Sequence, residues 1–384
     1  MKIAIVIIAY NRVKSLERLL DTLCQADYGN DKVTLIISID HSNTDIVEEF
    51  ADKFIWPFGE KRIKKHAENL GLKKHILSQG EEFSKYDALI ILEDDIIVSP
   101  AFYKYSLQTI NAYYNSDDIA GISLYSFPVN YLTGNPFVPY KNSYDCFIMN
   151  TAQSWGQIWM KRQWFEFYEW YLTNESFDYS DEIPGVLFSW HKSWLKYHTR
   201  YCAEKGKYFI YPYFSFSSNC GEAGTHSQNS YNNYQTVMQT SLDFRLRLPD
   251  VDKAVKYDVF FENKDIYSYI GLSESDCCID LNGSRQSSCG KRYWLSTQVL
   301  PYQIIKSYGL KLRPIEQNII AKVAGNEIFL YDTYLTVPKN KKGNKQLLIQ
   351  YRYRITDIVI FCHKYGVYNI LSQFGKKIIG KFFK

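Results

Sequence analysis

The stretch Leu89-Ile90-Ile91-Leu92-Glu93-Asp94-Asp95-Ile96-Ile97-Val98 decides the fold of this chain. An apolar run of this length, bounded by Tyr86-Asp87 and Ser99-Pro100, predicts a central β-strand over 88–94 that is covered on both faces. Three adjacent acids at its end repel one another and are costly to desolvate unless a cation neutralises them. Because carboxylates suit hard cations, this acidic triplet (Glu93–Asp95) predicts a Mg²⁺ or Mn²⁺ site. The plainer alternative is an acidic turn that ends the strand.

The segments before the triplet alternate between predicted strands and helices. Residues 3–9 and 33–40 predict strands, and each is followed by a segment with helical spacing of apolar residues. Such an order indicates a parallel, doubly wound sheet, in which ligands bind beyond the carboxyl ends of the strands. Arg12, Asp40 and the triplet each follow such an end, so we expect them to meet at one edge of the sheet.

Composition excludes several classes of protein. The chain has 384 residues, of which 46% are hydrophobic, which is typical of a globular protein, and its net charge of +4 predicts no extended nucleic-acid face. Eight cysteines without a CxxC spacing indicate reduced thiols in a cytosolic protein. No run is long enough to predict a spanning helix, and residues 1–10 predict a buried strand rather than a signal peptide.

The composition and apolar periodicity of the sequence change along the chain, which indicates separate regions. We expect a first domain over 1–240, a small accessory region over 241–337, and a basic linker with an amphipathic helix over 338–384. The helical pattern at 355–384 combines apolar residues with several lysines, which suits binding in the plane of an anionic membrane. A helix that docks its apolar stripe on the protein is the alternative.

Taken in order, the motifs of residues 1–235 resemble those of the GT-A glycosyltransferases, with the closer match to bacterial relatives of N-acetylglucosaminyltransferase I and family 2-like enzymes. The resemblance rests on Ile8-Ala9-Tyr10-Asn11-Arg12, on Asp40, and on the triplet followed by Ser99-Pro100. Ser154-Trp155-Gly156 and the segment 218–226 are similar to two later segments of that family. The resemblance implies a GT-A fold, that is, a doubly wound mixed α/β sheet, here with a smaller C-terminal α+β appendage and a basic tail helix.

The resemblance also implies roles for individual residues. Asp95 would ligate a divalent metal, Mn²⁺ or Mg²⁺, and His226 would be a second ligand or else a loop histidine with a structural hydrogen bond. The donor would be a nucleotide-diphosphate sugar, with a UDP-sugar favoured. Its binding residues would be Ala9, Tyr10, Arg12, Asp40, Asn69, Lys73, Glu93 and Asp94. The metal and Arg12 would stabilise the charge that develops on the diphosphate leaving group.

One position departs from the family pattern, which places Trp-Asp before the acceptor-side helix and uses that Asp as the general base. Here Trp190 is followed by His191, and histidine serves as a base near neutral pH. Asp181 and Glu182 are alternative bases just upstream, and His191 would then be an ordinary surface histidine. Trp155 and Trp159 are expected either to stack on a sugar or to pack in the core.

The favoured function is a metal-dependent, inverting glycosyltransferase that moves a sugar to a lipid-linked surface glycan, such as a capsule or O-antigen precursor. A non-catalytic glycan- or nucleotide-sugar-binding protein is an alternative, which the replacement by His191 keeps open. A sugar nucleotidyltransferase is disfavoured because no glycine-rich loop follows the first strand. The expected location is the cytoplasm, at the inner face of the cytoplasmic membrane.

Overall fold

The N-terminal half of the molecule alternates strands and helices as the sequence predicts. The computed structural model describes residues 1–178, 180–221, 234–338, 345–352, 355–369 and 371–372. Its first elements are β1 (Ile3–Ala9), α1 (Val13–Cys24), β2 (Thr34–Ile39), α2 (Ile46–Lys53), β3 (Lys61–Lys65), α3 (Gly71–Leu77), the 3-10 segment η1 (Ser78–Ser84) and β4 (Ala88–Glu93). β1 pairs in parallel with β2 and β4, and β2 pairs in parallel with β3.

β3 is a strand that the sequence did not predict. Its residues, Lys-Arg-Ile-Lys-Lys, include a single apolar side chain. It lies at the edge of the sheet, where basic side chains reach solvent and discourage pairing with other chains.

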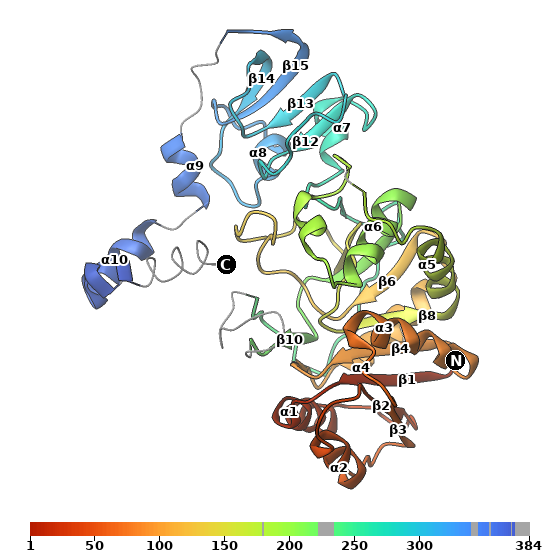
Figure 1. The fold of residues 1–384 in the computed structure, drawn as a ribbon. Coiled ribbons are helices and arrows are strands. Elements are labelled where there is room, and N and C mark those ends of the chain that lie inside the picture. The colour runs from red at the N-terminus through yellow and green to blue at the C-terminus, as the bar shows by residue number, and fades with distance from the viewer. Residues whose placement is uncertain (179, 222–233, 339–344, 353–354, 370, 373–384) are drawn as a thin grey trace.

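The second half of the sheet is mixed. Its elements are β5 (Ile96–Val98), α4 (Phe102–Tyr113), β6 (Ile119–Ser123), β7 (Cys146–Met149), β8 (Gln157–Met160), α5 (Lys161–Thr173), η2 (Gly185–Ser189), α6 (Leu195–Lys205), β9 (Tyr208–Pro212), β10 (Ser217–Asn219) and β11 (Lys256–Tyr257). The nine-stranded sheet has the order β11-β7-β9-β6-β8-β4-β1-β2-β3 (Figure 1). β8 joins the two halves because it lies antiparallel to both β4 and β6. β5 and β10 form a separate antiparallel pair.

Helices cover both faces of this sheet. Successive side chains of a strand point to opposite faces, so Ile5 and Ile7 pack in one core with α1 and α4, whereas Val6 and Ile8 pack in the other with α5 and α6. This explains why β1 and β4 read as continuous apolar runs.

The chain returns to the first sheet after residue 240. Phe244, Leu246 and Leu248 pack against the core that contains α1, and β11 pairs in parallel with β7. The first unit therefore continues beyond the boundary near residue 240 that the sequence indicated. The sequence between residue 240 and β11 lacks the alternation typical of a strand, which is why its return to the sheet was not predicted.

A four-stranded sheet forms the core of the second unit. It is built from β12 (Cys277–Asp280), β13 (Tyr293–Ser296), β15 (Ile328–Thr336) and β14 (Tyr302–Tyr308), in that order, with the short helices α7 (Ile266–Ile270) and α8 (Gln317–Ile320) packed on it. Figure 1 shows this unit beside the end of the first unit that carries α6. The predicted α+β appendage is confirmed.

The tail contains two helices, α9 (Lys345–Arg352) and α10 (Ile355–Tyr365). α9 packs Leu348 and Tyr351 on the second unit. The amphipathic helix predicted over 355–384 is interrupted: α10 ends at Tyr365, because Gly366 adopts a left-handed φ of +81°, and residues 367–369 and 371–372 are again helical. Residues 373–384 lie outside the described part of the chain. None of the helices in the described part is long and apolar enough to cross a membrane.

Candidate functional site

Three strand ends meet at one edge of the first sheet. The Asp40 N–H donates to the Ala9 carbonyl at 3.0 Å, and the Asp94 N–H donates to the Ile8 carbonyl at 3.1 Å. These bonds extend the β2–β1–β4 pairing by one residue and place Asp40 and the acidic triplet on either side of the end of β1. Arg12 immediately precedes α1 at the same edge. The predicted convergence of these residues is therefore present in the structure.

Arg12 is ion-paired with the triplet. Its guanidinium group contacts the Asp94 carboxylate, and Nη2 lies 3.3 Å from Asp95 Oδ2. Burial alone would lower the pKa of Arg12, but the charges of Asp94 and Asp95 outweigh it and raise that pKa. The cation is thus firmly charged, and it neutralises part of the negative charge at this edge.

One arginine does not balance three carboxylates. Burial raises the pKa of Glu93 well above its usual value, and the neighbouring charges of Asp95 and Asp94 raise it further. Asp95 Oδ1 is buried and has no hydrogen-bond partner within the described residues. A buried carboxylate oxygen without a donor is costly, and a divalent cation would satisfy it.

The residues present fit a metal held partly by other groups. The described ranges hold no cluster of three His, Cys, Asp or Glu side chains arranged around one ion. Asp95 is therefore the candidate protein ligand, and phosphate oxygens of a donor and water would complete the shell, as is usual for Mg²⁺. His226, the second ligand suggested by the sequence, lies outside the described residues.

Asp40 has a structural role that the sequence did not reveal. Its Oδ1 accepts hydrogen bonds from the backbone N–H groups of His41 and Leu70, at 3.0 and 2.8 Å, and Oδ2 accepts from the Gly71 N–H at 2.9 Å. Asp40 thus ties the start of α3 to the end of β2. Asn69 supports the same turn, because its Nδ2 donates to the His41 carbonyl at 2.8 Å.

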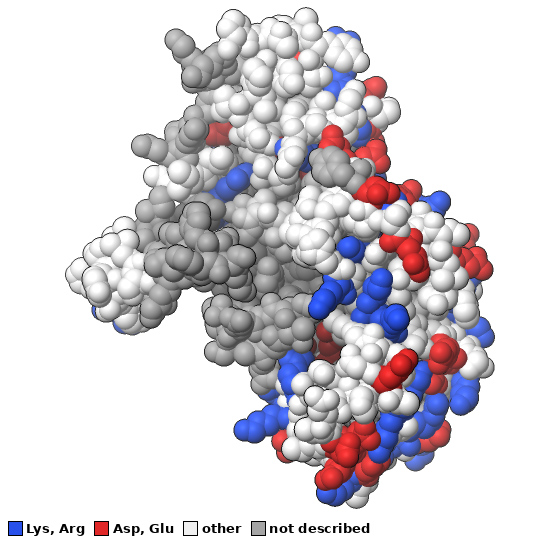
Figure 2. All heavy atoms as spheres, viewed as in Figure 1, with Lys and Arg blue, Asp and Glu red and all other residues white. Residues whose placement is uncertain are grey.

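Lys73, also predicted to bind the donor, points toward the neighbouring helices. Its Nζ lies 5.1 Å from the centre of the Tyr197 ring in α6 and 5.8 Å from that of Tyr171 in α5. Burial lowers the pKa of Lys196, and the charge of Lys73 lowers it further, so the two ammonium groups share a region. Figure 2 shows Lys and Arg side chains gathered on the face around α3 and α6. Such a region attracts phosphorylated ligands.

A pair of histidines near this turn, buried His75 and partly exposed His66, escaped the sequence analysis. Ser38 Oγ lies 2.8 Å from His75 Nε2 and 3.3 Å from His66 Nε2, and Gln79 Nε2 donates to the same hydroxyl at 3.1 Å. Burial lowers the pKa of His75 to about 4, so it is neutral at physiological pH. These residues have no recognisable spacing, so only the fold brings them together.

The later motif of the sequence lies beside the triplet. β10 pairs with β5, and the Cys220 N–H donates to the Asp95 carbonyl at 3.0 Å. Ser217 Oγ donates to the Trp155 carbonyl at 2.6 Å. Trp155 is partly exposed and packs between Tyr125 and Tyr234, with ring centres 5.0 and 5.2 Å away.

Trp159 belongs to the core. It is buried and stacks on Trp164, with ring centres 3.9 Å apart. Of the two tryptophans that the sequence offered as a sugar-stacking pair, Trp159 therefore follows the core-packing alternative.

The candidate bases lie on the segment before α6. His191 and Glu182 are exposed turn residues. Asp181 is also exposed, and its Oδ2 accepts a hydrogen bond from Ser287 Oγ of the second unit at 2.7 Å. The structure thus assigns Asp181 a contact between units, which the sequence could not show.

Comparisons with known proteins match part of the chain to a family model. Residues 4–167 match the model of glycosyl transferase family 2. Among solved structures, residues 1–349 of S. aureus TarS are 14% identical, with 56% of this chain and 60% of that chain covered and a TM-score of 0.37. The same TarS fragment with UDP-GlcNAc is 14% identical over 54% of this chain and 58% of that chain, with a TM-score of 0.35.

A third similar structure is the mannosyltransferase PcManGT from Pyrobaculum calidifontis in complex with GDP-Man and Mn²⁺. It is 12% identical, with 63% of this chain and 55% of that chain covered and a TM-score of 0.33. This chain therefore spans less than two thirds of the length of these relatives. Comparison with curated proteins found no match. The match to the glycosyl transferase family 2 model thus covers the part of the chain that carries Arg12, Asp40 and the acidic triplet, and this part lies in a mixed α/β sheet.

Proposed function

We propose that this chain transfers a sugar from a nucleotide-diphosphate donor bound at the edge where β1, β2 and β4 end. The observation that carries the proposal is the buried Oδ1 of Asp95, which has no hydrogen-bond partner within the described residues although an ion-paired Arg12 lies beside it. A site poised in this way accepts a divalent cation together with the phosphates that the cation binds.

The residues of this chain have distinct tasks in the proposed reaction. A bound Mn²⁺ or Mg²⁺ would neutralise the developing charge of the diphosphate leaving group. Arg12 supplies a second, fixed positive charge at the same edge. Asp40 holds the turn at Asn69–Gly71 in place, and this turn together with Tyr10 offers a rim for the nucleoside. Transfer with inversion then needs a base on the acceptor side, for which His191, Asp181 and Glu182 are the candidates.

The acceptor is proposed to be a glycan on a lipid carrier, with α10 held at an anionic membrane surface. The support is that apolar side chains of α10 and the residues after it lie in solvent: Phe361 is 49% exposed and Tyr368 is 83% exposed. Figure 1 shows α10 apart from both sheets. The docking alternative would require these side chains to be covered, and Lys364 in the same helix suits anionic headgroups.

The experiment that tests the donor site is a thermal-shift screen of nucleoside diphosphates and nucleotide sugars, with and without Mn²⁺. We expect stabilisation that requires both nucleotide and metal, and we expect Asp95→Asn to weaken nucleotide binding by at least about tenfold. Asp117→Asn is the matched control, because Asp117 is an exposed acid paired with Arg162. If no nucleotide stabilises the wild type, the transferase proposal fails.

A second measurement separates an enzyme from a binding protein. A transferase slowly hydrolyses its donor in the absence of an acceptor, so release of free sugar from the best-stabilising donor should require Mn²⁺. Metal-dependent binding without any hydrolysis or transfer would favour the non-catalytic alternative.

A further inference from the structure

Two cysteines of the second unit lie together at its contact with the first. Cys278 is buried in β12, and Cys289 is partly exposed in the loop between β12 and β13. The two side chains interact closely enough that each has the largest effect on the pKa of the other. Both are anchored on Ser287: Cys278 Sγ lies 3.9 Å from its carbonyl oxygen, and the Cys289 N–H donates to its Oγ at 3.1 Å.

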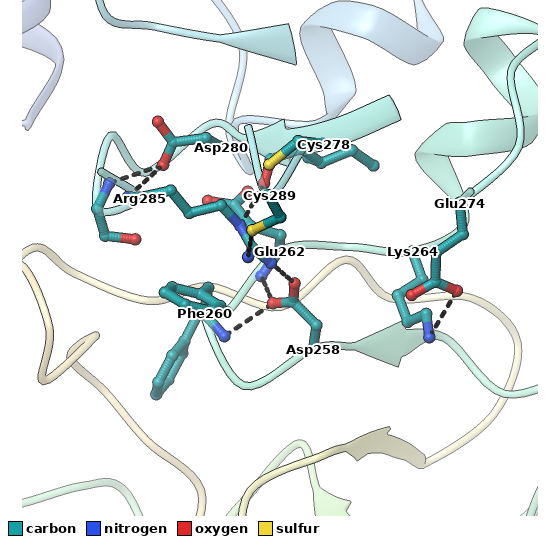
Figure 3. A network of polar contacts seen from close by, with 12 residues as sticks. Asp258, Phe260, Glu262, Lys264, Glu274, Cys278, Asp280, Arg285 and Cys289 are labelled. Carbon is teal, nitrogen blue, oxygen red and sulfur yellow. Dashed lines mark hydrogen bonds and ion pairs between the residues drawn. The ribbon is translucent and has the colours of Figure 1, made fainter. Parts of the chain in front are cut away.

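A fixed positive charge lies beside Cys289. Arg285 Nη1 is 3.8 Å from Cys289 Sγ, and Figure 3 shows this sulfur between the Cys278 sulfur and the Arg285 guanidinium group. The guanidinium group is held by an ion pair with Asp258 and by stacking 3.7 Å over the Phe260 ring. A positive charge that cannot move away stabilises a thiolate.

The two sulfurs are therefore unequal. The hydrogen bond from Cys278, followed by the charge of Arg285, lowers the pKa of Cys289 to about 6 against the opposing effect of burial. The same hydrogen bond, together with burial, raises the pKa of Cys278. Burial also raises the pKa of the neighbouring Glu262 well above its usual value. At neutral pH the pair holds one thiolate and one thiol.

We propose that Cys289 and Cys278 form a redox-active pair that a hydroperoxide converts to a disulfide. The Cys289 thiolate attacks one peroxide oxygen, the O–O bond breaks, Cys289 becomes a sulfenic acid, and hydroxide leaves. The Cys278 thiol then gives up its proton, its sulfur bonds to Cys289, and the S–O bond breaks. The departing hydroxyl takes the proton and leaves as water. The two sulfurs lose two electrons in total, and the peroxide gains them.

Oxidation would change the contact between the two units. In the reduced protein, Cys289 Sγ lies 3.6 Å from the Asp181 carbonyl oxygen, and Ser287 Oγ donates to the Asp181 carboxylate at 2.7 Å. A disulfide removes the negative charge of Cys289 and bonds its sulfur to Cys278, so the loop that makes both contacts is altered. The disulfide thereby changes how the second unit contacts the segment that leads to α6.

The first test is peptide mapping of the full chain after mild treatment with hydrogen peroxide at neutral pH. We expect a Cys278–Cys289 crosslinked peptide under conditions that leave Cys24 reduced, because burial raises the pKa of Cys24. Over-oxidation of Cys289 without a crosslink, or oxidation of Cys24 at the same rate, would overturn the proposal.

The second test measures alkylation of Cys289 by iodoacetamide as a function of pH. Half-maximal reactivity should lie near pH 6 in the wild type. Cys278→Ala removes the hydrogen-bond donor and should shift it toward the ordinary thiol value of about 8.5. Cys278→Ser keeps a donor and should fall between the two, whereas one common profile for all three proteins would contradict the proposed pairing. Neither test depends on transferase activity, so the two proposals stand or fall separately.

Discussion

Arg12 Nη2 lies 3.3 Å from Asp95 Oδ2, which joins the start of α1 to the turn between β4 and β5. The same guanidinium group contacts Asp94, whose side chain is 5% exposed. Arg12 thus stabilises the metal-free fold, in addition to any contact it makes with a diphosphate. The first prediction separates these two roles.

Arg12→Ala leaves the Asp94 carboxylate buried without its cation. We expect the free energy of unfolding to fall by about 2–4 kcal/mol, near the lower end for buried pairs because Arg12 is partly exposed. Urea denaturation measures the loss, and Mn²⁺ should restore more stability to the variant than it adds to the wild type. Arg162→Ala, which breaks an exposed pair with Asp117, should cost less than about 1 kcal/mol. Equal losses in both variants would show that Arg12 does not balance the triplet.

Asp40→Ala removes the acceptor of three backbone N–H groups at the turn before α3. We expect a loss of about 2–3 kcal/mol in stability. Nucleotide affinity, measured by calorimetry, should fall with it, since the turn at Asn69–Gly71 is released. Asp40→Asn keeps one oxygen and should give an intermediate result. Asp52→Ala, at an exposed acid paired with Lys65, is the control. If Asp40→Ala is as stable as the wild type, Asp40 does not anchor this turn.

Because His198 is buried, we expect the free energy of unfolding to depend on pH. It is fully buried, its two ring nitrogens have no hydrogen-bond partner within the described residues, and burial lowers its pKa to about 3. The unfolded chain takes up the proton from about pH 6.5 downward, whereas the folded chain does not, so stability falls as the pH falls. By pH 5 the loss from this group should reach about 2 kcal/mol.

The matching substitution is His198→Met, which removes the titrating group and keeps an apolar side chain in the space beside Phe167. Its stability should decline less steeply than that of the wild type between pH 7 and pH 5 in urea denaturation. His363→Met, at an exposed position of α10, should leave the slope unchanged. A wild-type slope in His198→Met would mean that other groups carry the pH dependence.

The exposed apolar face of the tail predicts membrane binding. Phe361→Glu combined with Tyr368→Glu should lower co-sedimentation with phosphatidylglycerol vesicles by more than tenfold, because both side chains are lost from the apolar contact and two negative charges are added. Binding should weaken with added salt, since each basic residue near the surface contributes about 1 kcal/mol. Phe214→Glu, at a similarly exposed position outside the tail, is the control. If neutral and anionic vesicles bind equally, the charge argument is wrong.

The sequence predicted the parts of the structure that depend on local pattern. The run before Glu93 could be read as a strand buried on both faces, and the parallel order then placed Arg12, Asp40 and the triplet at one edge. β3 could not be found, because an edge strand needs no apolar alternation. The three hydrogen bonds of Asp40 were also hidden, since they depend on where Leu70 and Gly71 lie in space.

Contacts between distant segments account for the other differences. The boundary near residue 240 was too early because β11 joins the sheet only through pairing with β7. Asp181 was considered only as a base, since nothing in its own neighbourhood of the sequence indicates Ser287 as a partner. Gly366 ends α10 by its backbone conformation, which an apolar periodicity continuing past it does not reveal.

The strand order of the large sheet has a consequence for how the protein is made on the ribosome. β1, β2, β3 and β4 are neighbours both in the chain and in the sheet, so this half can pair as soon as β4 has been synthesised. Until β8 follows, however, the inner side of β4 is an open edge directly beside the acidic triplet. Such an edge invites pairing with another chain, and like charges there oppose it. The acidic triplet, which includes the candidate cation ligand Asp95, thus also disfavours pairing of the nascent sheet with other chains before its second half exists.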